Sequence, residues 1–192
     1  MVITDEQLMA EVRGGDLRKL AVLFERHHRP LYNYFLHMNG KPDLSEDLVQ
    51  DVFFRILRYR HTYDEKRAFT GWMYQIARNT SIDHANKQRG ELQLVTERTE
   101  EDDRQVAEPV SQMPGADETI RKRQEVRLLR QALERLPEDK REILVLSRFQ
   151  NLAYDQIAGI LGCEVGAVKV RVYRATRALG QIYFEMAGER AS

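Results

Sequence analysis

Residues 152–179 have the sequence LAYDQIAGILGCEVGAVKVRVYRATRAL, which predicts two short helices joined by a tight turn. In the first helix Ile157, Ala158 and Leu161 form an apolar stripe, and Gly162 stands where a left-handed residue would end it. In the second helix apolar residues recur at spacings of three and four, so one face packs inward. This pattern is typical of a helix-turn-helix.

The other face of the second helix is basic, with no acidic residue from position 165 to 179. It carries Lys169, Arg171, Tyr173, Arg174, Thr176 and Arg177. A helix fits the major groove of DNA, where Lys and Arg reach guanine edges or phosphates. The alternative is an ordinary solvated helix, but such faces usually mix charges of both signs. The pattern therefore predicts DNA binding.

The net charge of zero hides an uneven distribution along the chain. Residues 1–90 hold 14 Lys and Arg against 12 Asp and Glu, residues 91–120 hold 2 against 9, and residues 121–192 hold 14 against 9. The basic C-terminal part suits nucleic acid. The acidic middle part contains Pro109 and Pro114 and lacks apolar periodicity, so it predicts a flexible linker between two domains.

The sequence argues against a secreted protein, a membrane protein, a disulfide-bonded protein and a metalloprotein. The start, MVITDEQ, lacks the basic and apolar regions of a signal peptide, and no apolar run is long enough to span a bilayer, so we expect a cytoplasmic chain without membrane insertion. Cys163 is the only cysteine, which excludes an internal disulfide or a CxxC site, and we expect it to pack as a small apolar residue. The five histidines are scattered. We therefore expect no metal, no cofactor and no catalytic residues.

The N-terminal half is predicted to be helical, which makes the fold class all-α. Thr4 and Gln7 form a plausible capping box for the first helix, and Pro30 is expected to lie in the first turn of a new helix. Residues 61–68 show no apolar periodicity and predict a loop.

An exposed strip is predicted on the helix around residue 50. Asp47, Gln50, Asp51 and Phe54 lie at i, i+3, i+4 and i+7, opposite the apolar face. Two carboxylates, an amide and an aromatic ring suit a protein partner with a basic surface. The alternative is a polar helix surface with Phe54 partly tucked into the core.

The helix predicted from Phe69 combines aromatic side chains with cations and amides. Such a mixture suits unpaired nucleic acid, because flipped bases stack on rings and amides hydrogen-bond to their edges. Trp72 alone would more often be a core residue.

Four segments in this order resemble the extracytoplasmic-function sigma factors of the sigma-70 family, subunits that direct bacterial RNA polymerase to promoters. They are EDLVQDVFFRIL at 46–57, FTGWMYQIARNTSIDH at 69–84, LPEDKREILVL at 136–146 and the helix-turn-helix. The resemblance implies two small helical domains on a flexible tether. Sigma region 2 would occupy residues 1–90, the linker 91–117, and sigma region 4, with the helix-turn-helix, 118–192.

The resemblance also implies a role for each surface in transcription initiation. The partners would be core RNA polymerase, through its beta-prime clamp helices and its beta subunit, promoter DNA and an anti-sigma factor. Core polymerase would bind Asp47, Gln50, Asp51 and Phe54. The minus-ten element would bind Tyr63, Lys66, Arg67, Phe69, Trp72, Arg78 and Asn79. The minus-thirty-five element would bind Lys169, Val170, Arg171, Tyr173, Arg174 and Arg177.

The sequence departs from the family pattern at several helix-turn-helix positions. Ala153 stands where a Ser or Thr usually caps the first helix, and Val170 replaces a usual hydroxyl residue. Loss of that hydroxyl favours an apolar contact, for example with a thymine methyl group, so the promoter sequence does not carry over.

Two other functions remain as alternatives. An ordinary transcription regulator, whose N-terminal part binds a ligand or dimerises, would not explain the segment from Trp72 to Asn79. An enzyme is disfavoured because no Walker loop, HExxH, nucleophile elbow or dinucleotide fingerprint is present.

Overall fold

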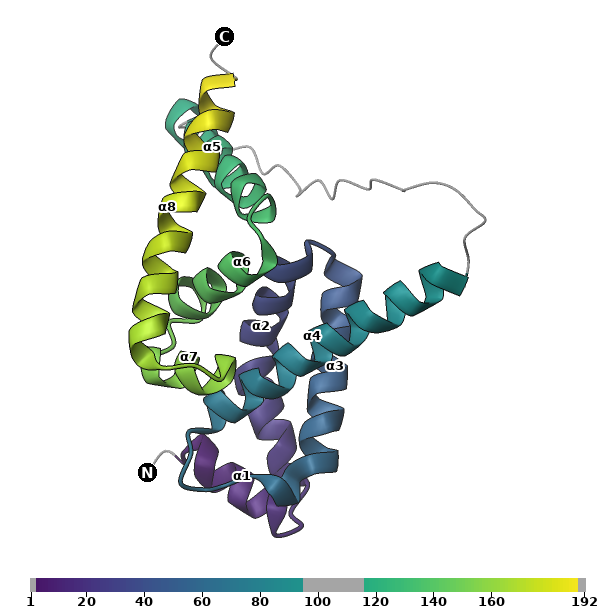
Figure 1. Ribbon diagram of the computed structural model, residues 1–192. Helices are drawn as coiled ribbons and strands as arrows, with labels where there is room; N and C mark the ends of the chain where they lie inside the picture. Colours follow the sequence, from purple (N-terminus) through teal and green to yellow (C-terminus); the bar gives the residue numbers. More distant parts are fainter. Residues whose placement is uncertain (1–2, 95–115, 190–192) are drawn as a thin grey trace.

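The computed structural model describes residues 3–94 and 116–189, and these ranges contain helices and turns but no strand (Figure 1). The all-α prediction is confirmed. The first domain comprises α1 (Asp5–Arg13), α2 (Arg18–Asn39), α3 (Pro42–Tyr59), a 3-10 turn η1 (Arg60–Thr62) and α4 (Phe69–Leu94). The second domain comprises α5 (Ala116–Glu134), α6 (Glu138–Leu144), a π-helical turn η2 (Val145–Phe149), α7 (Tyr154–Leu161) and α8 (Val165–Glu189). Residues 95–115 of the predicted linker lie outside the described residues.

Local sequence signals set several helix ends. The Thr4 hydroxyl accepts a hydrogen bond from the Gln7 N–H at 3.3 Å, and the Gln7 side chain accepts one from the Thr4 N–H at 3.0 Å. This confirms the capping box, which satisfies two of the free donors at the start of α1. Helix α2 ends at Gly40, whose φ of 70° lies in the left-handed region that glycine adopts without steric cost.

Helix α2 continues through Pro30, so the prediction of a new helix at that residue is wrong. Proline has no N–H and removes the helical hydrogen bond to the carbonyl of Arg26. Apolar burial on both sides of the proline compensates, because Leu23 precedes it, Leu31 and Phe35 follow it, and all three are fully buried. Tertiary packing therefore overrides the local signal.

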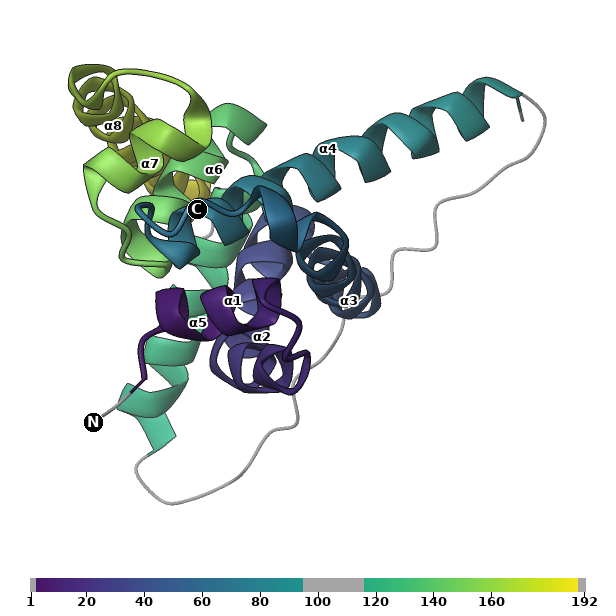
Figure 2. The same cartoon turned by 90° about the horizontal axis from the view of Figure 1, so that it is seen from below.

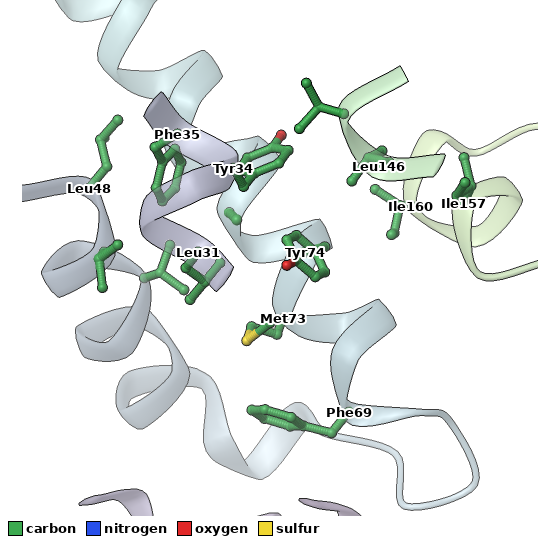
Figure 3. Packing of buried hydrophobic residues seen from close by; sticks show 14 of the residues in the cluster. Leu31, Tyr34, Phe35, Leu48, Phe69, Met73, Tyr74, Leu146, Ile157 and Ile160 are labelled. Atoms are coloured by element: carbon green, nitrogen blue, oxygen red, sulfur yellow. The ribbon is translucent and has the colours of Figure 1, made fainter. Parts of the chain in front are cut away.

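One apolar core runs through both domains. Figure 3 shows Tyr34 of α2 and Tyr74 of α4 between the first-domain residues and Leu146 and Ile160 of the second domain. The two tyrosine rings pack edge to face with centroids 5.5 Å apart, an arrangement that contributes about 0.5–1.5 kcal/mol beyond burial. The contact between the domains is thus part of the hydrophobic core.

Polar groups complete this contact. Glu142 of α6 is only 9% exposed; its carboxylate pairs with Arg78 of α4 at 3.0 Å and accepts a hydrogen bond from the Tyr34 hydroxyl at 3.4 Å. Tyr74 donates to the Gln150 side chain at 2.6 Å. Helix α4 also packs against α3 within its own domain and against α7 of the second domain. It is therefore in contact with both domains.

Within the second domain α7 and α8 form the predicted helix-turn-helix. Gly162 ends α7 with a φ of 62°, and the N–H of Cys163 donates to the carbonyl of Ala158 at 3.0 Å. The far end of α8 is held by α5, where Leu128 and Ala132 pack with Met186. Figure 1 shows α5 lying alongside the C-terminal half of α8.

The buried Glu142 makes stability depend on pH. Burial raises its pKa above the ordinary value of 4.5, although the Arg78 guanidinium opposes this. The folded protein then holds the Glu142 proton more tightly than the unfolded chain does. Protonation of Glu142 therefore stabilises the fold fully below the ordinary pKa, and this contribution is lost as the pH rises through the raised pKa of the folded state. We expect the melting temperature of Glu142→Gln to rise relative to that of the wild type as the pH increases above the ordinary pKa of glutamate. A difference in melting temperature that stays constant as the pH increases would contradict the assignment.

Candidate nucleic-acid and protein interfaces

The strip predicted on α3 is open to solvent. Asp47 and Gln50 are exposed, and Phe54 is 64% exposed although the adjacent Phe53 is buried. The alternative in which Phe54 is tucked into the core is therefore wrong. Aromatic residues are enriched at protein interfaces relative to the rest of the surface, so the exposed Phe54 ring is compatible with a protein partner.

Asp51 differs from the rest of the strip because it already has a partner. Arg55 donates to Asp51 at 3.2 Å and to Asp83 of α4 at 2.6 Å, so one guanidinium joins α3 to α4. The charge of Asp51 is partly compensated by this bridge. Asp47, for which the described residues provide no ion pair, is the freer carboxylate of the two.

The residues predicted for the minus-ten element fall into two groups by exposure. Lys66, Arg67 and Asn79 are exposed, and Trp72 and Arg78 are half-buried. Arg78 also pairs with Glu142 of the second domain. Only part of the predicted set is therefore free to meet a ligand in this conformation.

Tyr63 and Phe69 form the second group, because both side chains are buried. The Tyr63 ring packs 5.1 Å from the Trp72 ring, and its hydroxyl donates to the carbonyl of Arg67 at 2.8 Å. Burial, followed by the nearby carboxylate of Glu6, raises the pKa of Tyr63 to about 12. In this structure both rings anchor the loop between them, and neither presents a surface for base stacking.

Helix α4 carries two exposed amides that the sequence prediction missed. Gln75 lies one turn before Asn79, and Asn86 lies two turns after it, on the same exposed face as Ile82. The recurrence of amides at helical spacing was the available signal. Together they form a line of hydrogen-bonding groups suited to base edges.

The basic face of α8 is exposed as predicted, and its apolar stripe is buried. Val168, Val172 and Ala175 lie in the core. The residues predicted to contact DNA all lie outside it: Lys169, Val170, Arg171, Tyr173, Arg174 and Arg177. Val170 and Tyr173 are 47% and 62% exposed, so apolar and aromatic groups stand among the cations.

The positive charge of the basic face of α8 is not offset by ion pairs within the described residues. In the part of the chain that the structure describes, no acidic side chain forms an ion pair with Lys169, Arg171, Arg174 or Arg177. Arg177 lies over the Tyr173 ring, 6.0 Å from its centroid. This contact orients both side chains without reducing the positive charge.

Residues 3–94 and 116–189 contain neither a candidate metal site nor a membrane-spanning helix. These ranges contain no group of three or more His, Cys, Asp and Glu side chains that could hold a metal ion. None of the helices described is long and apolar enough to cross a membrane. Cys163 is half-buried and packs against the core, consistent with the expected packing role.

The three surfaces lie on different helices. The α3 strip and the minus-ten residues belong to the first domain, and the α8 face belongs to the second. Figure 2 shows α4 running between α3 and the α7–α8 pair.

Both domains are similar to families of known proteins. The Sigma-70 region 2 model matches residues 23–91, and the Sigma-70 region 4 model matches residues 127–179. The chain is 27% identical over 177 residues to the RNA polymerase sigma-H factor of Pseudomonas aeruginosa, covering 91% of each chain. It is 29% identical over 151 residues to the ECF RNA polymerase sigma factor EcfG of Rhodopseudomonas palustris, covering 79% of this chain and 77% of that one.

A solved structure supports the same likeness. The sigma factor RpoE of Bartonella quintana, in its co-crystal structure with the anti-sigma factor NepR, matches with a TM-score of 0.67 and 25% identity. The match covers 84% of this chain and 94% of that chain. The similarity therefore extends through both helical domains.

The neighbouring residues Phe53 and Phe54 provide a test of which ring is structural. Phe53 packs edge to face on Phe24 at 4.9 Å, so Phe53→Ala should reduce the free energy of unfolding by about 3–5 kcal/mol. Phe54→Ala should change it by no more than about 0.5 kcal/mol, because its ring is exposed. Urea denaturation of both variants measures the difference. Similar losses for the two would show that Phe54 is a core residue.

Proposed function

Because the chain belongs to the extracytoplasmic-function group of the sigma-70 family of RNA polymerase sigma factors, we propose that it divides promoter recognition between its two domains. The first domain, residues 1–90, binds core polymerase and the minus-ten element. The second, residues 118–192, binds the minus-thirty-five element. The chain acts in the cytoplasm and contributes no catalysis of its own.

One observation carries this proposal. The two family matches fall on separate helical domains, and each domain presents an exposed surface of the required chemistry. The first presents the acidic strip with Phe54, and the second presents the unpaired basic face of α8. A regulator that only binds duplex DNA would need the second surface alone.

For polymerase binding, the α3 strip suits a basic partner. Asp47 supplies charge, Gln50 supplies hydrogen bonds, and the Phe54 ring supplies apolar area at the C-terminal end of the strip. By family likeness the partner surface is the clamp helices of the beta-prime subunit. Asp51 acts partly through its bridge with Arg55, which fixes α3 against α4.

For the minus-ten element, the exposed groups suit an unpaired strand. Lys66 and Arg67 lie beside the path of a phosphate backbone along α4, and Asn79 can hydrogen-bond to a base edge. Trp72 offers part of its ring for stacking. Tyr63 and Phe69 contribute by anchoring the loop.

For the minus-thirty-five element, α8 acts as a recognition helix in the major groove. Lys169 lies nearest its N-terminal end, and Arg174 lies further along the same face. Val170 offers an apolar contact to a thymine methyl group. Arg171 and Arg177 bind phosphates.

A protein partner also regulates the chain. The relative from Bartonella quintana was crystallised with an anti-sigma factor, and its fold extends over most of this chain. We infer an anti-sigma factor for this protein on that likeness.

Reconstitution with core polymerase tests the proposed function. The chain should associate with core polymerase and start transcription from promoters selected out of a randomised pool. Asp47→Lys should weaken the association about tenfold, since it reverses a charge that faces a basic surface. Glu25→Lys, an exposed residue of α2 with the same change in net charge, should have little effect. Duplex DNA binding by a chain that does not associate with core polymerase would instead identify a regulator.

The α8 assignments predict two different losses in DNA binding. Arg174→Ala should lose roughly 1–3 kcal/mol for the preferred minus-thirty-five duplex and relax the preference at one or two base pairs. Arg177→Ala should weaken all sequences alike and lower the salt dependence by about one counterion. Both are measured on a preferred and a scrambled duplex at several salt concentrations. Equal weakening of both duplexes by Arg174→Ala would make its role electrostatic.

A further inference from the structure

Residues 64–68 form a short exposed loop between two buried rings. All five of these residues are exposed, whereas Tyr63 before them and Phe69 after them are buried. The loop includes Lys66 and Arg67, which the proposed function assigns to the minus-ten strand. Its conformation therefore decides where these two cations point.

Hydrogen bonds within the loop close it into a turn. The Tyr63 hydroxyl donates to the carbonyl of Arg67 at 2.8 Å, and the N–H of Arg67 donates to the carbonyl of Asp64 at 3.0 Å. The Asp64 side chain accepts from the N–H of Lys66 at 3.0 Å. These bonds shape the loop, and the buried rings of Tyr63 and Phe69 anchor it in the core.

Helix α1, far away in sequence, holds both ends. At the entry, Arg13 donates to the carbonyl of Tyr63 at 3.3 Å and pairs with Glu65 at 3.1 Å. At the exit, the Glu6 carboxylate accepts from the N–H of Phe69 at 3.0 Å, which satisfies a free donor at the start of α4. Glu6 and Arg13 are seven residues apart, so they lie two turns apart on one face of α1.

Helix α1 is itself firmly attached. Asp5 contacts His27 of α2 at 2.6 Å and Arg26 at 2.7 Å, and the apolar face of α1 is buried through Leu8 and Met9. The attachment points on α1 therefore do not move independently of α2. A rigid element that holds both ends of a loop restricts the loop to few conformations.

We propose that α1 is a brace for this loop and that Glu6 and Arg13 are positioning residues for minus-ten recognition. The proposal rests on the proposed function of the first domain. A loop that is already ordered loses less conformational entropy when it binds a strand, and its fixed geometry discriminates between bases. The Arg13–Glu65 pair is exposed on both sides, so it contributes little to global stability and acts mainly on loop geometry.

The test uses holoenzyme formed from the full chain and core polymerase, with single-stranded minus-ten oligonucleotides selected by the wild-type holoenzyme from a randomised pool. The discrimination ratio is the affinity for the selected oligonucleotide over that for single-base substitutions of it. Arg13→Ala and Glu6→Ala should reduce the ratio about five- to tenfold, as expected when one or two hydrogen bonds are lost. Affinity for core polymerase and for a minus-thirty-five duplex should stay within about twofold of the wild type.

Two variants serve as matched controls. Glu6→Gln keeps an acceptor for the N–H of Phe69 and should retain most of the discrimination. Arg18→Ala removes an exposed ion pair with Asp16 that does not touch the loop, and it should leave the ratio unchanged.

Each alternative outcome has a distinct meaning. Full discrimination by folded Arg13→Ala and Glu6→Ala would overturn the brace and leave the proposed function intact. Loss of helicity in both variants would also overturn it, since a brace holds the loop and not the domain. No sequence preference in the wild-type holoenzyme would remove the minus-ten assignment and the brace with it.

Discussion

The apolar face of α4 is the surface on which both domains depend. Met73 and Ala77 are fully buried, and Tyr74 lies between the core of the first domain and the side chains of the second. Helix α3 packs on this helix within the first domain, and α7 packs on it from the second. Because α4 also presents Asn79 and Arg78, the helix that organises the core is the one that displays part of the proposed minus-ten surface.

Features that depend on neighbouring residues could be predicted from the sequence. The cap at Thr4, the turn at Gly162 and the two faces of α8 each follow from residues within a few positions of one another. The exposed strip on α3 could be predicted for the same reason, since helical spacing places it on the side opposite the buried apolar face. Local periodicity thus gave the fold class and two of the three surfaces.

Features that depend on distant residues could not be predicted. Arg78 and Glu142 are 64 positions apart, and neither residue type indicates that they would form a mostly buried pair. The burial of Tyr63 and Phe69 depends on α1 and on the position of Trp72. Helix α2 continues through Pro30 because the burial of Leu31 and Phe35 outweighs the local effect of a proline. In each case tertiary packing decided what local sequence could not.

The pairing of Arg78 with Glu142 bears on the proposed minus-ten surface, because it engages one of the cations of that surface. If Arg78 contacts DNA, as proposed for the minus-ten surface, the Glu142 carboxylate competes with a phosphate or base for the N–H donors of its guanidinium. The observed affinity is then the intrinsic affinity multiplied by the fraction of molecules in which the domains have separated. If the closed arrangement is favoured by about 1.4 kcal/mol, roughly one molecule in ten is open and the apparent affinity falls about tenfold. On the proposed function, the strength of the contact between the domains would set the concentration needed for promoter occupancy, independently of any base contact.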